Sequence, residues 1–323
     1  MAQPSRRHLI KSAVLAAAAV CVPPLGRAQE NITRLVVTFP PGGIGDIVTR
    51  LMAQQLAKSM GQPFVVENRA GASGRVGTQF VHRAAPDGTT LLLGNTVTMV
   101  TGPLVWKTTG YDPINDFIPI SQALEFELAY AAAPNVPVKD LREYAAWAAR
   151  DPRNAVFGSP SIGGLGHFLG LQVGREIKVE LTHVGYKGSA PLTNDLMAGQ
   201  IPAGIDTLDA QVRARNAKLL ATTGRKRSAF LPNVPTFTEL GYPEVQGTGW
   251  FGFFAPARTP KPLIDRLSRE FAAAARTPEV TQRLRAISYE PIGSTSEEFA
   301  QTLRADREKF SPLIKASGLV LDE

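Results

Sequence analysis

The sequence contains very little of what metal, redox and disulfide sites require. Cys21 is the only cysteine among 323 residues, and the histidines are His8, His82, His167 and His183. No two of these histidines have the spacing of a zinc site and no cysteine accompanies them, so the sequence predicts no metal site. With one cysteine the chain forms no internal disulfide, and the fold must be held together by packing alone.

Nucleotide-binding glycine motifs are absent as well. Neither G-x-G-x-x-G nor G-x-x-x-x-G-K-[ST] occurs, so we expect no nucleotide site and no cofactor. The formal charge is +7, but residues 1–28 supply four basic residues and no acidic one, which leaves +3 for the remainder. This small excess does not indicate nucleic-acid binding.

Residues 1–28 have the features of an export signal. A twin-arginine pattern at Arg6-Arg7 is followed by an apolar run from Ala13 to Val22, which is too short to span a bilayer comfortably. Small residues around Ala28 suit cleavage. We therefore expect a twin-arginine signal peptide at 1–28 and a periplasmic mature protein of about 295 residues, large enough for two lobes.

The stretch from Arg34 to Arg50, RLVVTFPPGGIGDIVTR, predicts a strand, a glycine turn and a helix. An apolar run ends at Pro40-Pro41, and we expect Asp46 to cap the helix that follows. Such a turn directs backbone N–H groups to the space beyond the strand, where the helix dipole favours an anion. From this stretch alone, an ordinary βα connection and an anion site both remain open.

The same order of strand, small polar turn and helix recurs along the chain. Strands are expected at 64–68, 89–93, 118–121, 128–132, 154–158, 179–184, 201–206, 219–223 and 247–255, with helices at 74–83, 140–149, 165–175, 190–198, 262–275 and from 295 onward. This alternation predicts a mainly parallel α/β sheet. Because ligands bind beyond the carboxyl ends of strands in such sheets, we expect a ligand site among these turns.

Five motifs then occur in a recognisable order: RLVVTFPPGG-x-x-D, VVENRAGASG, AAPDGTTLLLG, HVGYKGSAP and PNVPTFTELG. Together they closely resemble the Bug family, the solute-binding proteins of tripartite tricarboxylate transporters, over nearly the whole mature chain. The resemblance implies a type II periplasmic-binding fold, with two α/β lobes and a ligand cleft between them. Lobe 1 is expected at 29–127 plus 252–323, and lobe 2 at 128–251. The resemblance also implies a small carboxylate ligand and no catalysis.

In this family the ligand is held largely by main-chain N–H groups and small hydroxyls. The contacts that the resemblance implies in lobe 1 are Phe39, Gly42, Gly43, Ile44, Gly45, Asp46, Asn95, Thr96 and Thr98. Those that it implies in lobe 2 are Ser159, Ser161, Gly163, Gly164, His167, Tyr186, Lys187, Gly188 and Asp206. Oriented N–H groups complement a carboxylate without placing a full charge in the cleft.

The sequence departs from the family in a consistent direction. Positions at which the family commonly has Gly, Ser, Thr or Asn are occupied here by Ile44, Gly45, Ile162, Gly164, Leu165 and Gly166. Polar side chains are thus lost while the backbone donors remain. Because apolar walls suit an apolar or aromatic body, our hypothesis is a monocarboxylate or aromatic carboxylate rather than citrate or a small hydrophilic dicarboxylate.

Two alternatives from other classes remain open. Ser161, His183 and Asp206 suggest a secreted serine hydrolase, since S-P-S-I-G is one residue short of G-x-S-x-G. A ligand sensor for a membrane receptor would have the same sequence features as a transport protein. Tyr186 and Trp250 are explained equally well by the cleft and by core packing. We expect a monomer that is not an enzyme and that meets membrane transporter subunits or a receptor.

Overall fold

The computed structural model describes residues 32–207 and 217–322. The predicted signal peptide at 1–28 lies outside the described residues. Ile32–Glu323 forms a single compact unit. Within the described part of the chain, no helix combines the length and the apolar character needed to cross a membrane.

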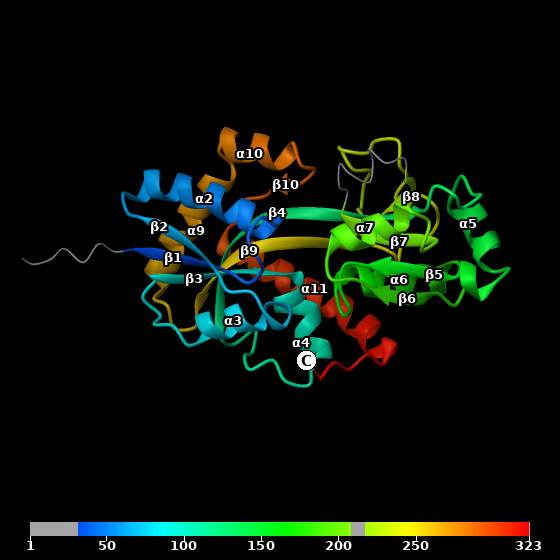
Figure 1. Cartoon of the computed structure of the whole chain (residues 1–323). Helices are drawn as coiled ribbons and strands as arrows, with labels where there is room; N and C mark the ends of the chain where they lie inside the picture. The colour runs from blue at the N-terminus through cyan, green and yellow to red at the C-terminus, as the bar shows by residue number, and fades with distance from the viewer. Residues whose placement is uncertain (1–31, 208–216, 323) are drawn as a thin grey trace, which may run out of the picture. The chain divides into compact units, whose positions relative to one another are not determined.

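The first part of this unit alternates strands and helices, as the sequence predicted (Figure 1). Its elements are β1 (Thr33–Val37), α2 (Ile44–Met60), β2 (Phe64–Asn68), the 3-10 turn η1 (Ala72–Gly74), α3 (Arg75–His82), β3 (Thr90–Asn95), the π turn η2 (Val97–Thr101) and α4 (Gly102–Val105). The sequence predicted only a small polar turn at 94–98, so η2 and α4 were missed.

Helix α2 begins differently from the prediction. Its N-cap is Gly43, in an extended conformation with φ −79° and ψ 170°, and no side chain caps it. Asp46 lies in the first turn, so the expectation that it caps the helix was wrong. Its carboxylate instead accepts a hydrogen bond from the Gly42 N–H, at 3.1 Å, and so binds the turn that precedes the helix.

Strand β4 (Phe117–Ala132) is one long strand where the sequence predicted two short ones. It pairs with β9 (Thr248–Pro256) as far as Glu127. From Leu128 onward it pairs instead with β7 (Ala203–Thr207). The two long strands therefore connect the strands of the first part of the unit to those of the second (Figure 1).

The second part repeats the alternation, and the chain then returns through β9. The further elements are α5 (Leu141–Ala148), the 3-10 turn η3 (Pro152–Asn154), β5 (Val156–Ser159), α6 (Leu165–Glu176), β6 (Thr182–Gly185), α7 (Ser189–Met197), β8 (Lys218–Thr222), α9 (Lys261–Ala275), α10 (Pro278–Arg285), β10 (Glu290–Pro291) and α11 (Ser296–Ser317). Helix α11 begins with a capping box, in which Thr295 and Glu298 are bonded reciprocally. Helix α10 was not predicted.

The sheet is mixed rather than mainly parallel, which corrects the prediction. Its main strand order is β2-β1-β3-β9-β4-β7-β5-β6. The outer strands pair in parallel, as β1 does with β2 and β3, and β5 with β6 and β7. The central pairs are antiparallel, because β4 carries the chain out of the first part and β9 carries it back.

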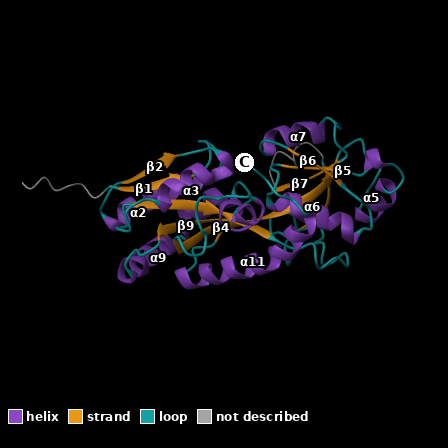
Figure 2. Cartoon of the chain, turned by 90° about the horizontal axis from the view of Figure 1, so that it is seen from below, coloured by secondary structure: helices purple, strands orange, loops and turns teal. Residues whose placement is uncertain are grey.

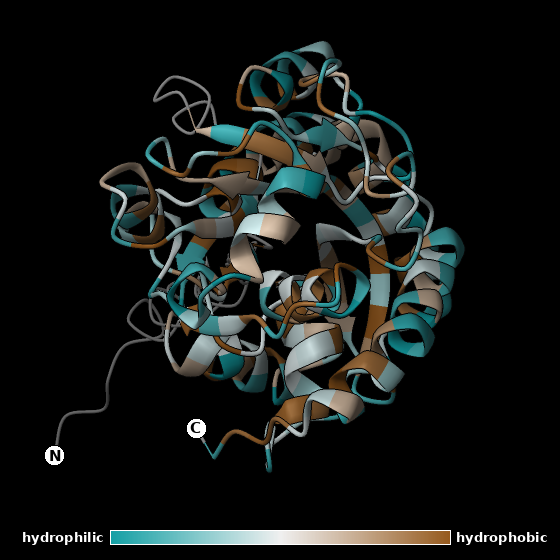
Figure 3. Ribbon diagram, turned by 90° about the vertical axis from the view of Figure 1, so that its right-hand side faces the viewer, coloured by the Kyte–Doolittle hydropathy of each residue, from teal (hydrophilic) through white to brown (hydrophobic). Residues whose placement is uncertain are grey.

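Helices cover the sheet and bury their apolar faces against it. Figure 2 shows α11 lying along β4 and β9, and it also contacts α6. Figure 3 shows that single helices carry both hydrophobic and hydrophilic residues, as helices with one buried face do. Trp250 and Phe253 on β9 are among the fully buried side chains, so the strand predicted at 247–255 is present and largely buried.

The Glu127 carboxyl group lies where β4 changes partners, and we expect it to make the stability of the fold depend on pH. Burial, and then the nearby Glu125 carboxylate, raise its pKa to about 7. The folded chain thus keeps a proton that the unfolded chain loses near pH 4.5, so stability falls as the pH rises from about 4.5 to 7. Because the group is partly exposed, we expect Glu127→Gln to raise the free energy of unfolding at pH 8 by only about 1 kcal/mol.

Chemical denaturation at pH 5 and pH 8 measures this effect. Glu308→Gln is the matched control, because Glu308 is exposed and the same charge is removed. An equal effect of both substitutions at both pH values would contradict the assignment to Glu127.

Candidate functional site

A large hollow lies at the carboxyl ends of the strands, where the sequence predicted a ligand site. An outer cavity of about 1010 Å³ opens onto an inner pocket of about 200 Å³. The two share lining residues, among them Ile44, Asn95, Ser161 and Phe251. We call the two together the cleft. Residues at or just after the carboxyl ends of β1, β3, β5, β6 and β7 line the cleft.

Most of the predicted contact residues line this cleft. The outer cavity is lined by Phe39, Gly42, Gly43, Ile44, Gly45, Asp46, Asn95, Ser161, Tyr186, Lys187 and Gly188. The inner pocket adds Thr96 and Asp206. Segments from distant parts of the sequence therefore meet at one surface, as the resemblance implied.

The other predicted contact residues lie next to the lining and not in it. They are Thr98, Ser159, Gly163, Gly164 and His167. Each contacts a neighbouring loop or lining residue. Thr98 hydrogen-bonds Asn95, Ser159 donates to the Ser161 carbonyl, and Gly164 packs on the Ser161 hydroxyl.

Three helices begin at the cleft, and none has a side-chain cap. The N-caps of α2, α6 and α7 are Gly43, Gly164 and Gly188. By contrast, α5, α10 and α11 are capped by side chains of Asp or Thr. The first N–H groups of a helix have no intrahelical partner. No side chain occupies these groups at α2, α6 and α7, although the His167 N–H bonds the Gly164 carbonyl at 3.1 Å and Pro191 in α7 has no N–H. The remaining first N–H groups are available to an anion, and the helix dipoles add a partial positive charge.

The loop before α2 is fixed by Asp46. Its carboxylate accepts hydrogen bonds from the Gly42 N–H, the Arg50 guanidinium at 3.0 Å and the Asn68 amide at 3.0 Å. The bond from Arg50, helped by those from Gly42 and Asn68, holds the pKa of Asp46 below its usual value despite burial. Because these partners satisfy the carboxylate, Asp46 acts here as the anchor of the loop.

Asn95 presents a donor to the cleft. Its Oδ1 accepts hydrogen bonds from the N–H of Thr98 at 3.0 Å and from the Thr98 hydroxyl at 3.2 Å. These bonds fix the orientation of the amide, and its Nδ2 has no hydrogen-bond partner among the described residues. Thr98 is thus a buried support that aims the Asn95 NH₂ group, and the ligand contact predicted for Thr98 stays a prediction.

Two stacked histidines support the loop after β5. The rings of His167 and His183 lie 3.7 Å apart, and His183 Nε2 lies 2.8 Å from the Ser159 hydroxyl. His167 Nδ1 accepts the Gly163 N–H at 3.1 Å. Burial lowers the pKa of His167 to about 4, and burial together with His167 lowers that of His183 to about 3. Both rings are therefore neutral at pH 7, and His183 is bonded to Ser159 rather than to Ser161.

The turn after β6 brings one basic side chain to the cleft. Gly188 has φ +106°, a conformation that glycine adopts without strain. Lys187 is exposed and forms no ion pair with any residue that the structure describes. Tyr186 donates its hydroxyl to Asp195 at 2.9 Å, and burial raises its pKa to about 12. Lys187 is thus placed to attract an anion toward the cleft.

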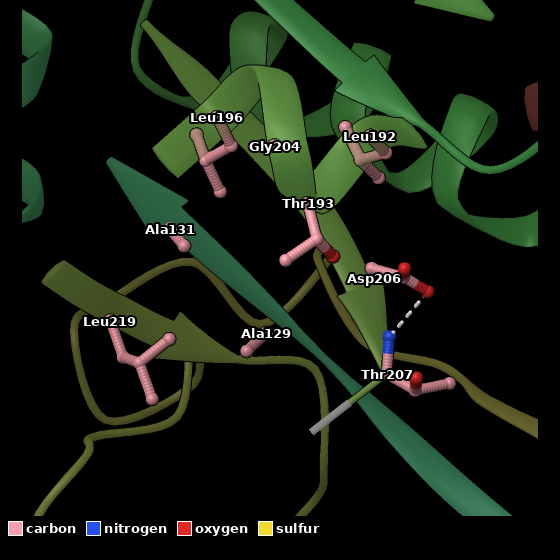
Figure 4. Close-up of a pocket in the computed structure, with 9 residues that line it drawn as sticks. All are labelled: Ala129, Ala131, Leu192, Thr193, Leu196, Gly204, Asp206, Thr207 and Leu219. Carbon is pink, nitrogen blue, oxygen red and sulfur yellow. Dashed lines mark hydrogen bonds between the residues drawn. The ribbon is translucent and has the colours of Figure 1, made fainter. Parts of the chain in front are cut away.

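Asp206 lines the inner pocket near the end of β7. Its Oδ1 accepts the Thr207 N–H at 2.7 Å. The same residue also lines a separate cavity of about 20 Å³ between β4, α7 and β8 (Figure 4). That cavity has room for a water molecule and no solute, so the cleft is the candidate ligand site.

Several lining residues were missed by the sequence analysis. The cleft is also lined by Ser73, Val97, Phe126, Pro160, Ser189, Thr207, Phe251 and Tyr289. Ser189 follows the predicted turn at Gly188 directly, so the same motif could have located it. Phe126 and Tyr289 carry no such signal, because neither lies in a predicted turn after a strand.

A mixed α/β unit with a strand-end cleft, reached by uncapped helix starts, defines a binding protein of the type II periplasmic class. The model of the family described as "Tripartite tricarboxylate transporter family receptor" matches residues 48–319. This chain therefore belongs to that family, which confirms the resemblance found in the sequence. Protein BugT of Bordetella pertussis is 30% identical over 292 residues, 89% of this chain and 90% of BugT.

Solved structures agree with this assignment. Rpa4515 of R. palustris, determined with adipate, has a TM-score of 0.80 at 32% identity, covering 89% of this chain and 97% of that one. MatC from Rhodopseudomonas palustris, with bound malate, has a TM-score of 0.76 at 29% identity, covering 88% of this chain and 99% of that one.

Proposed function

We propose that this protein captures a small organic carboxylate in the periplasm and delivers it to membrane subunits of a tripartite tricarboxylate-type transporter. The observation that carries the proposal is the convergence of α2, α6 and α7 on one cleft, each starting at a glycine without a side-chain cap. Their N–H groups offer a carboxylate several donors. The adipate and malate bound by two relatives are ligands of this kind.

The body of the ligand is apolar or aromatic in this proposal. Ile162 and Leu165, which stand where the family commonly has polar side chains, line the cleft, and so does Ile44 at a position where glycine is usual. An apolar lining with a few placed polar groups favours a ligand of the same character. Citrate, which needs partners for three carboxylates, is a poor match for such walls.

Binding is coupled to closure of two lobes. The exchange of partners along β4 between Glu127 and Leu128 supports a boundary there, since that is where the second set of strands begins. In this mechanism the ligand first meets one lobe, and closure then adds donors of the other. The protein acts as a monomer, without cofactor or catalysis, after export through the signal at 1–28.

A thermal-shift screen against monocarboxylates, dicarboxylates and tricarboxylates tests the proposal. A ligand that binds only the native state raises the melting temperature by mass action. At about 100 times its Kd we expect a rise of about 5 °C or more. If no acid in the panel raised the melting temperature, the result would contradict the proposal that this protein binds a carboxylate.

The hydrolase alternative is measured on the same sample with p-nitrophenyl esters. In the described structure His183 pairs with Ser159, and no bond joins it to Ser161. We expect no turnover. Ester hydrolysis that disappears in Ser161→Ala would overturn the proposal in favour of an enzyme.

A further inference from the structure

The inner pocket contains a cluster of aromatic rings. Phe126 comes from β4, Phe251 from β9, and Tyr289 from the segment before β10. The ring of Phe126 lies 6.1 Å from that of Phe251 and 5.7 Å from that of Tyr289, the latter edge to face. A ligand ring beside this cluster would have aromatic partners, and aromatic pairs are favourable beyond the area they bury.

The position of the Phe126 ring depends on a glycine in the paired strand. Gly249 lies opposite Phe126 in the β4–β9 ladder. A Cβ atom at Gly249 would lie 2.3 Å from Cζ of Phe126, so any other residue there would displace the ring. Gly249 itself lines the inner pocket. The Phe126 ring therefore occupies the place that a side chain at residue 249 would take.

The size and the polarity of the pocket suit one aromatic ring. Its volume is about 200 Å³, and an apolar cavity of about 150 Å³ in another protein holds benzene. Its polar groups include Asn95, Ser161 and Ser189, which also line the outer cavity. The Asn95 amide and the start of α7 at Ser189 thus stand where the inner pocket meets the outer one.

We propose that the inner pocket is a subsite for the ring of an aromatic carboxylate, with Phe126 as the residue that selects aromatic over saturated rings. The ligand then lies with its ring among Phe126, Phe251 and Tyr289 and its carboxylate toward Asn95 and the uncapped helix starts. The inference rests on the proposed function and deepens it, because it names the class of carboxylate.

Calorimetric titration with matched acids tests the subsite. The probes are benzoate, phenylacetate and 3-phenylpropanoate, each paired with its cyclohexyl counterpart, so that charge and length are constant within a pair. We expect the aromatic acid of the best-binding pair to bind roughly 2- to 10-fold more tightly than its saturated partner. Phe126→Leu is expected to abolish this preference.

Two further variants keep the test independent of folding. Gly249→Ala pushes the Phe126 ring into the pocket and is expected to weaken binding of the aromatic acid, while Phe64→Leu in β2, outside the cleft, leaves the preference unchanged. Equal affinity within every pair, or a preference that survives in both Phe126→Leu and Gly249→Ala, would overturn the inference. If aliphatic acids bind and no acid that contains a ring binds, only the inference fails. If no acid of any kind binds, the proposed function fails with it.

Discussion

Gly43→Phe is expected to lower ligand affinity about 100-fold or more while the protein still folds. Gly43 lines the outer cavity at the start of α2. Its φ of −79° is available to every residue, and the atom nearest to a Cβ at this position would be the Pro40 carbonyl oxygen, at 3.9 Å. A phenyl ring is therefore admitted without backbone strain, but it occupies the space in front of the N–H groups that we assign to the carboxylate.

Gly43→Ala is the matched control for this experiment. Its single methyl group meets no atom closer than 3.9 Å, so affinity should fall little and the free energy of unfolding should change by less than about 1 kcal/mol. Calorimetric titration gives the affinity and denaturant melts give the stability. Unchanged affinity in Gly43→Phe would exclude the start of α2 from the site.

Asp46→Ala is expected to lower the free energy of unfolding by about 2 kcal/mol and ligand affinity by about tenfold. The carboxylate is buried, and its removal takes an acceptor from the Gly42 N–H, from Arg50 and from Asn68. Arg50 keeps its bond to the Asn68 Oδ1, and Asn68 keeps its bond to the Phe39 carbonyl. The loss of affinity follows because Asp46 holds the loop that presents Gly43 and Gly45. Denaturant melts and titration of the same preparation measure the two effects.

The exposed pair Lys261–Asp265 supplies the control, since it has the same i,i+4 spacing as Asp46–Arg50. Asp265→Ala should lower the free energy of unfolding by at most about 0.5 kcal/mol. The pKa of Asp46 is lowered in the fold, so its contribution is present above the unfolded pKa and is lost as the pH falls through the folded pKa. If Asp46→Ala and Asp265→Ala lowered the free energy of unfolding equally at pH 7, the result would contradict the anchoring role of Asp46.

Local sequence patterns predicted most elements of the fold, because each depends on neighbours in the chain. The strand, glycine turn and helix at 34–60 were anticipated from apolar spacing and from Pro40-Pro41. The direction of β9 was not, since pairing between β4 and β9 joins residues more than a hundred positions apart. No local signal distinguishes an antiparallel return from another parallel strand.

The site was predicted where backbone turns form it and missed where side chains converge from several elements. Gly43 and Gly188 follow strands and begin helices, which the sequence shows directly. Gly163 was expected to face the ligand. It has φ +75°, and a Cβ atom there would lie 3.2 Å from Val105 and from Leu321, so a bulky residue would strain the backbone. The ligand contact predicted for Gly163 stays a prediction.

The central claim is that the cleft at the starts of α2, α6 and α7 binds one small carboxylate. The most direct measurement is a calorimetric titration of the wild-type protein and of Gly43→Phe with the acid that gives the largest thermal shift. We expect a single saturable site in the wild type and an affinity about 100-fold or more lower in the variant. Equal binding by both proteins, or no binding of any acid by the wild type, would contradict it.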